Sequence, residues 1–279
     1  MNLKLLHIFL LSTGGTLLLC TPLIHTTELV NGLVIGKMCW FHLVMLFFSV
    51  CVFFVVLTKR TTAIAFLSSD LLLLIFTGTV LITYKWSLNP EPEKLIFIGQ
   101  LVIFWFLLRY ILTAYREFNF FFLFVGILTG LVEAVWGMQQ LHGHAYSNHS
   151  LFRLTGSFFN PGPYSGYLAV VLPVGLWMAL RFQKGMRCFG YICVGAILIV
   201  LPAGMSRSAW MAAVVACGWV YWAERIGWEK TKAVYRRNKN ATIPFIAIVA
   251  ILVGCAIAEL YGLKRDSADG RLLMWKVTG

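Results

Sequence analysis

Long apolar runs alternate with short polar connections along this chain. Most runs are close to the roughly 20 residues that an α-helix needs to cross a bilayer, and they are too long for the strands of a membrane barrel. The pattern therefore predicts an all-α, polytopic membrane protein. About nine transmembrane helices are expected, at residues 5–24, 38–57, 63–82, 95–113, 118–138, 163–181, 189–204, 206–222 and 243–260.

The composition strengthens this prediction, because 59% of the residues are hydrophobic and only 12% are charged. A typical soluble chain is about half apolar and about a quarter charged. In a soluble protein, a net charge of +12 would suggest nucleic acid as a partner, but the chain carries no nucleic-acid-binding motif. Its basic residues lie mostly in the connections between spans, where they fit membrane topology and contact with anionic membrane lipids.

The distribution of lysine and arginine also predicts an orientation. With a cytoplasmic N-terminus, most basic residues of the connections fall on the inner side, as at 181–187 and 225–239. An odd number of spans then places the C-terminus outside. In this arrangement the segment around residue 153 and the short connection at 206–207 face the same outer side.

A polar segment broken by glycine and proline, residues 153–166, interrupts the apolar sequence. Its three glycines and two prolines cannot continue a helix. One interpretation is a tight loop that presents backbone N–H groups and the guanidinium of Arg153 to an anionic ligand. The other is a simple turn that enters a helix, with Pro163 in the first helical turn. Both interpretations remain open.

Arg207 lies between two apolar runs, with only Ser206 and Ser208 as polar neighbours. An arginine at an interface can be a plain anchor. Anchors gather on the cytoplasmic side, however, whereas Arg207 is expected at the tip of an outward hairpin. A guanidinium can contact a phosphate through two parallel hydrogen bonds. With Arg153 and Arg271 on the same face, it would suit a lipid-linked diphosphate that gains charge as a leaving group.

Three segments resemble motifs of one family. Residues 153–161 read RLTGSFFNP and resemble R-x-T-G-[TS]-F-x-N-P; residues 206–210 read SRSAW and resemble S-R-[GS]-[AG]-[WL]. Residues 270–275 read GRLLMW and resemble G-R-x-x-x-W. These are motifs of the superfamily that holds O-antigen ligases, O-antigen polymerases and bacterial O-oligosaccharyltransferases. The resemblance covers residues 150–279, with the motifs in order.

The resemblance implies a glycosyltransferase of the bacterial inner membrane whose active face is periplasmic. Family members move a glycan from undecaprenyl diphosphate to an acceptor hydroxyl on lipid A core, on another glycan or on a protein. They are similar to inverting, metal-independent transferases of the GT-C type, so no cofactor and no metal ion are expected. The implied diphosphate-binding residues are Arg207, Arg153, Arg271, Ser206 and Asn160.

The same resemblance divides the chain into a transmembrane helical domain, 1–260, and the start of a large periplasmic loop, 261–279. In the family this loop continues and carries a catalytic histidine and a further arginine. The chain ends before such a histidine, so we expect a C-terminal truncation, and an inactive fragment is one open interpretation. No residue within 1–279 takes the histidine's role by motif.

Two carboxylates fall inside predicted spans, where a charge is costly unless it is paired or functional. Asp70 lies at a depth where Arg109 could pair with it. Glu133 lies near the outer end of its span, where we expect it to orient Arg153 or Arg207, or to act as an acid or base beside the diphosphate. The loop histidines His142, His144 and His149 have a spacing that could bind a metal ion, but solvated side chains are the favoured interpretation.

A secondary transporter or lipid flippase is the main alternative function. It rests on the two intramembrane carboxylates and on the break at 160–163, because discontinuous helices are typical of transporters. Such helices usually occur as a pair in two related halves, and only one break is evident here. Polymerase and protein O-oligosaccharyltransferase activities stay open within the same superfamily.

Overall fold

The computed structural model describes residues 3–26, 32–59, 66–86 and 92–237, and these residues are overwhelmingly helical. The all-α fold class is therefore confirmed for this part of the chain. The α-helices are α1 (Leu3–Leu19), α2 (Gly32–Thr58), α3 (Ser68–Lys85), α4 (Pro92–Ala114), α5 (Glu117–Leu141), α6 (Pro161–Arg181), α7 (Lys184–Val200), α8 (Arg207–Tyr221) and α9 (Gly227–Arg237). Short helical turns complete them: η1 (Thr21–Leu23), η2 (Pro202–Gly204) and η3 (Trp222–Ile226).

Within these ranges, six helices are long and apolar enough to span a membrane: α2 to α6, and α7 continued to Gly204. Helices α1 and α8, also predicted as spans, have 17 and 15 residues. The remaining predicted span, 243–260, and the whole segment 261–279 lie outside the described residues. The polytopic membrane character is confirmed, and the number of nine spans stays a prediction.

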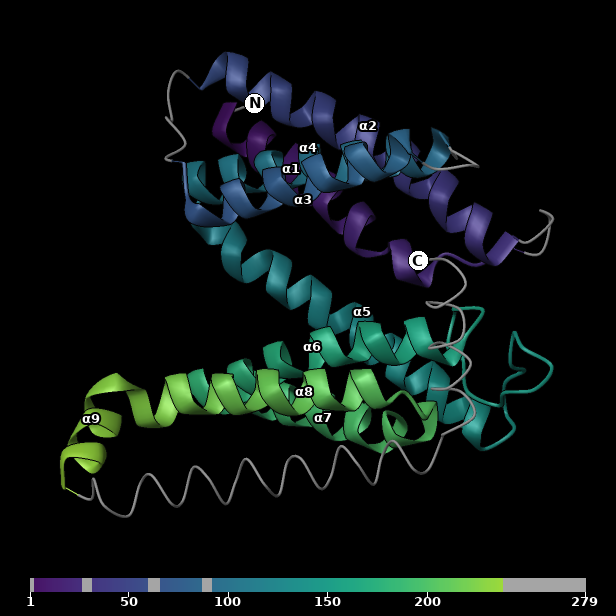
Figure 1. Ribbon diagram of the computed structural model, residues 1–279, viewed down its shortest axis with the longest axis vertical. Helices are drawn as coiled ribbons and strands as arrows, with labels where there is room; N and C mark the ends of the chain where they lie inside the picture. Colours follow the sequence, from purple (N-terminus) through teal and green to yellow (C-terminus); the bar gives the residue numbers. More distant parts are fainter. Residues whose placement is uncertain (1–2, 27–31, 60–65, 87–91, 238–279) are drawn as a thin grey trace.

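Helix α5 joins two groups of helices (Figure 1). Its first half packs with α1, α2 and α4 in one apolar cluster, which includes Phe118, Leu11, Phe48 and Ile111. Its second half packs with α6, α7 and α8 in another, which includes Ile127, Ala134, Leu168, Tyr164 and Ile197. Helices α5 and α6 approach each other closely at Gly130, where a Cβ would lie 2.5 Å from Val171 of α6. Helix α5 thus belongs to both cores.

The ion pair expected for Asp70 is present. Asp70 lies in the first turn of α3, fully buried, and its Oδ2 accepts hydrogen bonds from Arg109 of α4 and from the backbone N–H of Leu67 at 2.8 Å. Its Oδ1 accepts a hydrogen bond from the indole N–H of Trp105 at 2.8 Å. One carboxylate therefore caps the start of α3 and ties it to α4, as a buried charge requires.

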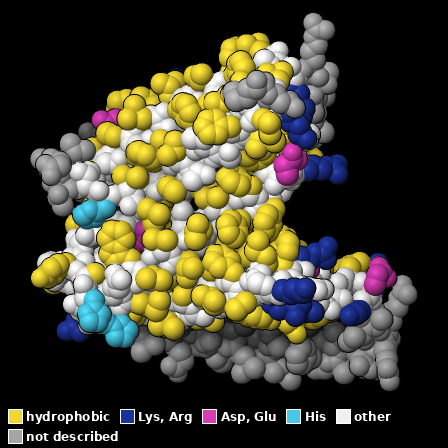
Figure 2. All heavy atoms as spheres, turned by 180° about the vertical axis from the view of Figure 1, so that it is seen from behind, with side chains coloured by type: hydrophobic (Ala, Val, Ile, Leu, Met, Phe, Trp, Pro, Cys, Tyr) yellow, Lys and Arg dark blue, Asp and Glu magenta, His cyan; other side chains and the backbone are white. Residues whose placement is uncertain are grey.

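The surface carries a broad band of exposed apolar side chains (Figure 2). Leu43, Leu72, Val170 and Val214 are each 68–73% exposed although they lie within helices. Lysine and arginine side chains gather at one edge of that view. An apolar band bounded by charge is the arrangement expected of a protein whose helices face lipid, and it agrees with the predicted membrane location.

The turn into α6 follows helix-capping rules. Asn160 is extended, and its side-chain oxygen accepts a hydrogen bond from the N–H of Gly162 at 3.0 Å. Pro161 follows at the first helical position, where its missing N–H costs nothing. The helix therefore begins two residues before the predicted boundary at Pro163, and the simple-turn interpretation is correct for residues 160–163.

Candidate functional site

Residues 153–160, which we call the motif segment, fold back over the end of α5. The side-chain oxygen of Gln140 accepts hydrogen bonds from the N–H groups of Thr155 (2.9 Å) and Gly156 (2.7 Å). Its amide nitrogen donates to the carbonyl oxygens of Gly156 and Tyr146, both at 3.0 Å. Asn148 donates to the carbonyls of Gly156 and Phe158 at 3.1 Å. Two amide side chains thus fix the conformation of the segment.

Glu133, about two turns before Gln140 on α5, accepts the next backbone N–H group. Its Oε2 accepts the N–H of Ser157 at 3.0 Å, and the carboxylate is completely buried. The hydroxyl of Tyr164 donates to the backbone carbonyl of Glu133 at 3.1 Å. Oε1 has no hydrogen-bond partner among the described residues. Helix α5 therefore bonds the segment directly through Glu133, and Tyr164 of α6 bonds to the backbone of that same residue.

These contacts correct one expectation. One of the two interpretations of residues 153–166 is a loop that presents backbone N–H groups, such as those of Thr155, Gly156 and Ser157, to an anionic ligand. In the structure all three donate inward, to Gln140 and Glu133, and residues 154–157 are buried. They are unavailable to an anion, because a satisfied buried donor has no free hydrogen to offer. Arg153, by contrast, is exposed.

Lys37, in the second turn of α2, is the cation that acts on Glu133. Its ammonium donates to the carbonyls of Pro22 and Ile24 and to the hydroxyl of Ser157 at 3.2 Å. It also lies over the ring of Phe158, 5.1 Å from the centroid. Ser157 Oγ donates in turn to the carbonyl of Pro22. The end of α1, the start of α2 and the motif segment meet at this lysine.

Among the described residues, the Glu133 carboxylate accepts the N–H of Ser157, and its expected role in orienting Arg153 or Arg207 stays a prediction. Lys37 is linked to Glu133 through Ser157, whose hydroxyl accepts from the ammonium and whose N–H donates to the carboxylate. The sequence hid this because Lys37 stands at the edge of an apolar run and reads as a loop residue. Its only signal was a lysine on the predicted outer side, where the positive-inside bias disfavours one.

Arg207 opens α8, directly after a tight turn against α6. Met205 adopts a left-handed conformation (φ 48°), and the hydroxyls of Ser206 and Ser208 are 3.3 Å apart. A Cβ on Gly204 would lie only 2.0 Å from Ser165 Oγ of α6. Arg207 itself is partly buried. This contact brings the turn before Arg207 against the first turn of α6, which begins where the motif segment ends.

The other predicted diphosphate-binding residues have mixed outcomes. Arg153 is exposed. The loop between α5 and α6, which contains it, lies at the same end of the molecule as the α7–α8 turn (Figure 1). Asn160 is exposed, but its side-chain oxygen is used to cap α6. Arg271 lies outside the described residues. The structure therefore brings the segments around Arg153 and Arg207 to the same end of the bundle and gives Asn160 a structural role.

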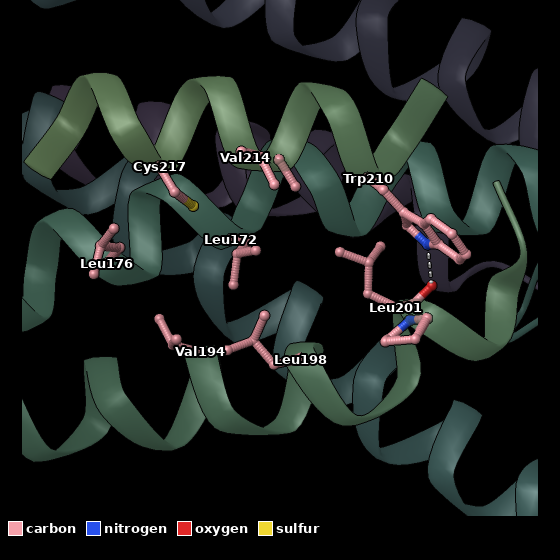
Figure 3. A pocket seen from close by; sticks show the side chains of 10 residues that line it. Leu172, Leu176, Val194, Leu198, Leu201, Trp210, Val214 and Cys217 are labelled. Atoms are coloured by element: carbon pink, nitrogen blue, oxygen red, sulfur yellow. Dashed lines mark hydrogen bonds between the residues drawn. The ribbon is translucent and has the colours of Figure 1, made fainter. Parts of the chain in front are cut away.

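A cavity of about 440 Å³ lies between α6, α7 and α8 (Figure 3). Leu172, Leu198, Val214 and Cys217 point into it, and Trp210 closes one end while its indole N–H donates to the carbonyl of Leu201 at 2.9 Å. The walls offer hydrocarbon and one thiol, with no charged side chain. Such a space suits an apolar chain and cannot orient a sugar or a diphosphate.

The loop histidines are separated by their packing. The ring of His149 packs at a tilt against Phe152 and Phe159, whereas the rings of His142 and His144 are stacked with centroids 6.5 Å apart. Over the described ranges, no group of three or more His, Cys, Asp or Glu side chains could hold a metal ion. The spacing that suggested a metal site does not gather its three imidazoles.

Comparison of the chain with protein-family models, with curated proteins and with solved structures found no match.

Proposed function

We propose that this protein is an O-antigen ligase-like glycosyltransferase, which moves a glycan from undecaprenyl diphosphate to a periplasmic acceptor hydroxyl. The acceptor class comprises lipid A core, a glycan or a protein. In this proposal the protein lies in the bacterial inner membrane with its N-terminus in the cytoplasm. The reaction is inverting and needs no metal ion.

The observation that carries the proposal is the adjacency of two motif elements that lie 40 or more residues apart in the sequence. The turn that leads into Arg207 packs on Ser165, in the first turns of α6, and the motif segment ends at that helix. Arg153 is exposed, and the α5–α6 loop that contains it lies at the same end as the α7–α8 turn (Figure 1). Two guanidinium groups at one end of an apolar bundle are suited to a diphosphate whose lipid chain extends into the membrane.

In this proposal Arg207 contacts the diphosphate and stabilises the charge that develops as the glycan leaves. Arg153 contributes from the exposed rim. Glu133, Gln140 and Lys37 position the motif segment from beneath and do not touch the donor. The proposal also includes Arg271, which lies outside the described residues. It assigns the base that activates the acceptor to no described residue.

The transport alternative loses the support of Asp70, one of the two carboxylates on which it rests. Asp70, which would carry a coupling proton, is engaged by Arg109, Trp105 and the backbone of Leu67. Three donors favour the ionised form of a carboxylate, so Asp70 has a structural role and does not carry a proton. Polymerase and protein O-oligosaccharyltransferase activities use the same donor, so the test below separates them by acceptor.

The test is complementation of a strain that lacks its own surface-glycan ligase, with the glycan ladder on lipopolysaccharide as the readout. We expect the protein, expressed from its full reading frame, to restore the ladder. Arg207→Lys keeps the charge but loses the planar fork, and should reduce the ladder by roughly tenfold or more. The matched control is Arg187→Lys, an exposed arginine near the start of α7, at the opposite end of that helix.

The outcomes divide clearly. A restored ladder that Arg207→Lys leaves intact would make Arg207 an interfacial anchor and overturn its donor role. If no ladder forms while immunoblots show the protein in the membrane, the next readouts are polymer length and glycosylated protein. Absence of all three products would refute the glycosyltransferase proposal.

A further inference from the structure

Two apolar cavities meet at Lys37. The larger, about 490 Å³, runs between α1, α5 and α6 and is lined by side chains such as Leu18, Phe122, Ile127 and Val171. The smaller, about 380 Å³, lies between α2, α4 and the motif segment and is lined by side chains such as Val34, Met38, Phe97 and Phe159. The two share four lining residues, namely Thr21, Lys37, Phe41 and Phe158.

The shared wall holds the polar groups. The three hydrogens of the Lys37 ammonium go to oxygens of Pro22, Ile24 and Ser157. The Ser157 contact is the longest of the three, and it is the one that a phosphate oxygen would replace, since Ser157 Oγ also bonds to the carbonyl of Pro22. Thr21 Oγ1 is buried and has no hydrogen-bond partner among the described residues. A buried hydroxyl without a partner is uncommon and asks for an explanation, such as a ligand atom that it contacts. An ammonium and a spare hydroxyl therefore stand where two hydrocarbon-lined lobes join.

Their depth fits a lipid head group. Lys37 is five residues into α2, roughly 8 Å along its axis from the first residue at 1.5 Å per residue. The larger lobe reaches from this level to Gly126 of α5 and Val174 of α6, whereas the smaller lobe lies beside the first turns of α2, α4 and α6. Phosphate is an anion that an ammonium and a hydroxyl recognise together, and basic pockets between transmembrane helices bind lipid phosphates.

We propose that this double cavity binds an anionic diacyl phospholipid, with its phosphate on Lys37 and Thr21 and one acyl chain in each lobe. Two lobes of similar volume on either side of one cation match a lipid with two chains. A single prenyl chain would fill one lobe and leave the other empty. The site is distinct from the proposed diphosphate site, because its polar groups are Lys37 and Thr21 and not the exposed arginines.

The lipid would brace the two groups of helices. Its larger lobe is walled by α1 from one group and by α6 from the other, with α5 between them. Its smaller lobe touches Phe159, Asn160 and Pro163, where α6 begins. Occupancy therefore stabilises the motif segment from the membrane side.

The experiment uses the purified full chain in detergent and two variants that leave its ion pairs intact. Thr21→Val removes only the hydroxyl without a partner and keeps the side-chain shape. Gly126→Leu fills the larger lobe, because Gly126 lines it and a Cβ there meets nothing within 4 Å. The matched controls are Thr79→Val, at an exposed position of α3, and Gly195→Leu, at an exposed position of α7 where a Cβ also meets nothing within 4 Å.

The measurement is the shift in thermal unfolding temperature as dioleoyl phosphatidylglycerol is titrated, with dioleoyl phosphatidylcholine and undecaprenyl phosphate as parallel probes. We expect a saturable rise with phosphatidylglycerol, as for any ligand that binds the folded state. Loss of a hydrogen bond to a charged group should weaken the apparent affinity in Thr21→Val by about tenfold. Gly126→Leu should abolish the rise, and both controls should keep it.

Two results would overturn the proposal. Equal shifts with phosphatidylglycerol and phosphatidylcholine, unchanged in both variants, would mean an annular lipid effect without a site. A larger shift with undecaprenyl phosphate than with phosphatidylglycerol, lost in Gly126→Leu, would mean that the cavity receives a single prenyl chain. Neither result bears on the glycan-ladder assay, so the two proposals fail independently.

Discussion

Replacement of Gly156 by alanine tests the central feature of the motif segment, which is its attachment to α5. Gly156 has φ +56°, a left-handed conformation. A Cβ at this position would lie 2.4 Å from Glu133 Oε2 and 2.4 Å from the ring of Tyr164. Both neighbours are completely buried and hydrogen-bonded, so neither can move away without breaking its own contacts.

The expected cost follows from two separate terms. The left-handed conformation costs an alanine about 1–2 kcal/mol. Forcing a methyl group into a filled core costs a further 1–3 kcal/mol, roughly, because the surroundings must shift. We therefore expect Gly156→Ala to lower the free energy of unfolding by about 2–5 kcal/mol.

Two glycines provide matched controls. Gly143 is also left-handed (φ +78°), but a Cβ there meets nothing within 4 Å, so Gly143→Ala should show the conformational term alone. Gly126 is helical and equally open, so Gly126→Ala should be neutral or slightly stabilising, since alanine favours a helix by up to about 1 kcal/mol.

Unfolding can be followed in detergent through the reaction of buried cysteines with a thiol dye. Cys51 and Cys193 are free thiols at 4% and 0% exposure, one in each apolar cluster region. If Gly156→Ala proves no more destabilising than Gly143→Ala, the close approach of Glu133 and Tyr164 to the motif segment is not real, and the site geometry derived from it fails.

Two further changes test single polar groups. Gln140→Leu leaves the N–H groups of Thr155 and Gly156 without an acceptor and should cost about 2–6 kcal/mol of unfolding free energy, at 1–3 kcal/mol for each buried orphan; the exposed neighbour in Gln139→Leu should cost little, and equal losses in the thiol-dye assay would contradict the assigned bonds. Asp70→Asn removes the charged acceptor of the Arg109 guanidinium and should lower the free energy of unfolding, whereas Asp70→Asn combined with Arg109→Met should recover part of that loss. No recovery in the same assay would mean that the pair is not coupled.

The sequence was most informative about features that are energetically costly in a membrane, namely unpaired backbone groups and unpaired charges. Apolar length predicted the helices, because backbone groups in hydrocarbon must be satisfied within a helix. The cost of a buried charge predicted the pairing of Asp70 with Arg109, and the structure confirms it. Both inferences use a rule that holds regardless of tertiary contacts.

The inward use of the motif segment's N–H groups could not be predicted in the same way. It depends on Gln140 and Glu133, which lie 15 or more residues earlier and reach the segment only because the chain folds back over α5. The role of Lys37 depends on a contact across 120 residues, to Ser157. Local patterns carry no information about such distances, although a glycine within the motif did mark the point of close approach.

The sharing of α5 between both apolar clusters has a consequence for how the protein is made. Helices α1, α2 and α4 precede α5 in the chain, so the first core can close as soon as the beginning of α5 has entered the membrane. N-terminal units generally fold first during synthesis. The second half of α5 then stands as a finished surface on which α6, α7 and α8 assemble in turn. A defect in the first core should therefore reach the second as a failure of biogenesis, with the later helices inserted but unpacked and open to membrane proteases.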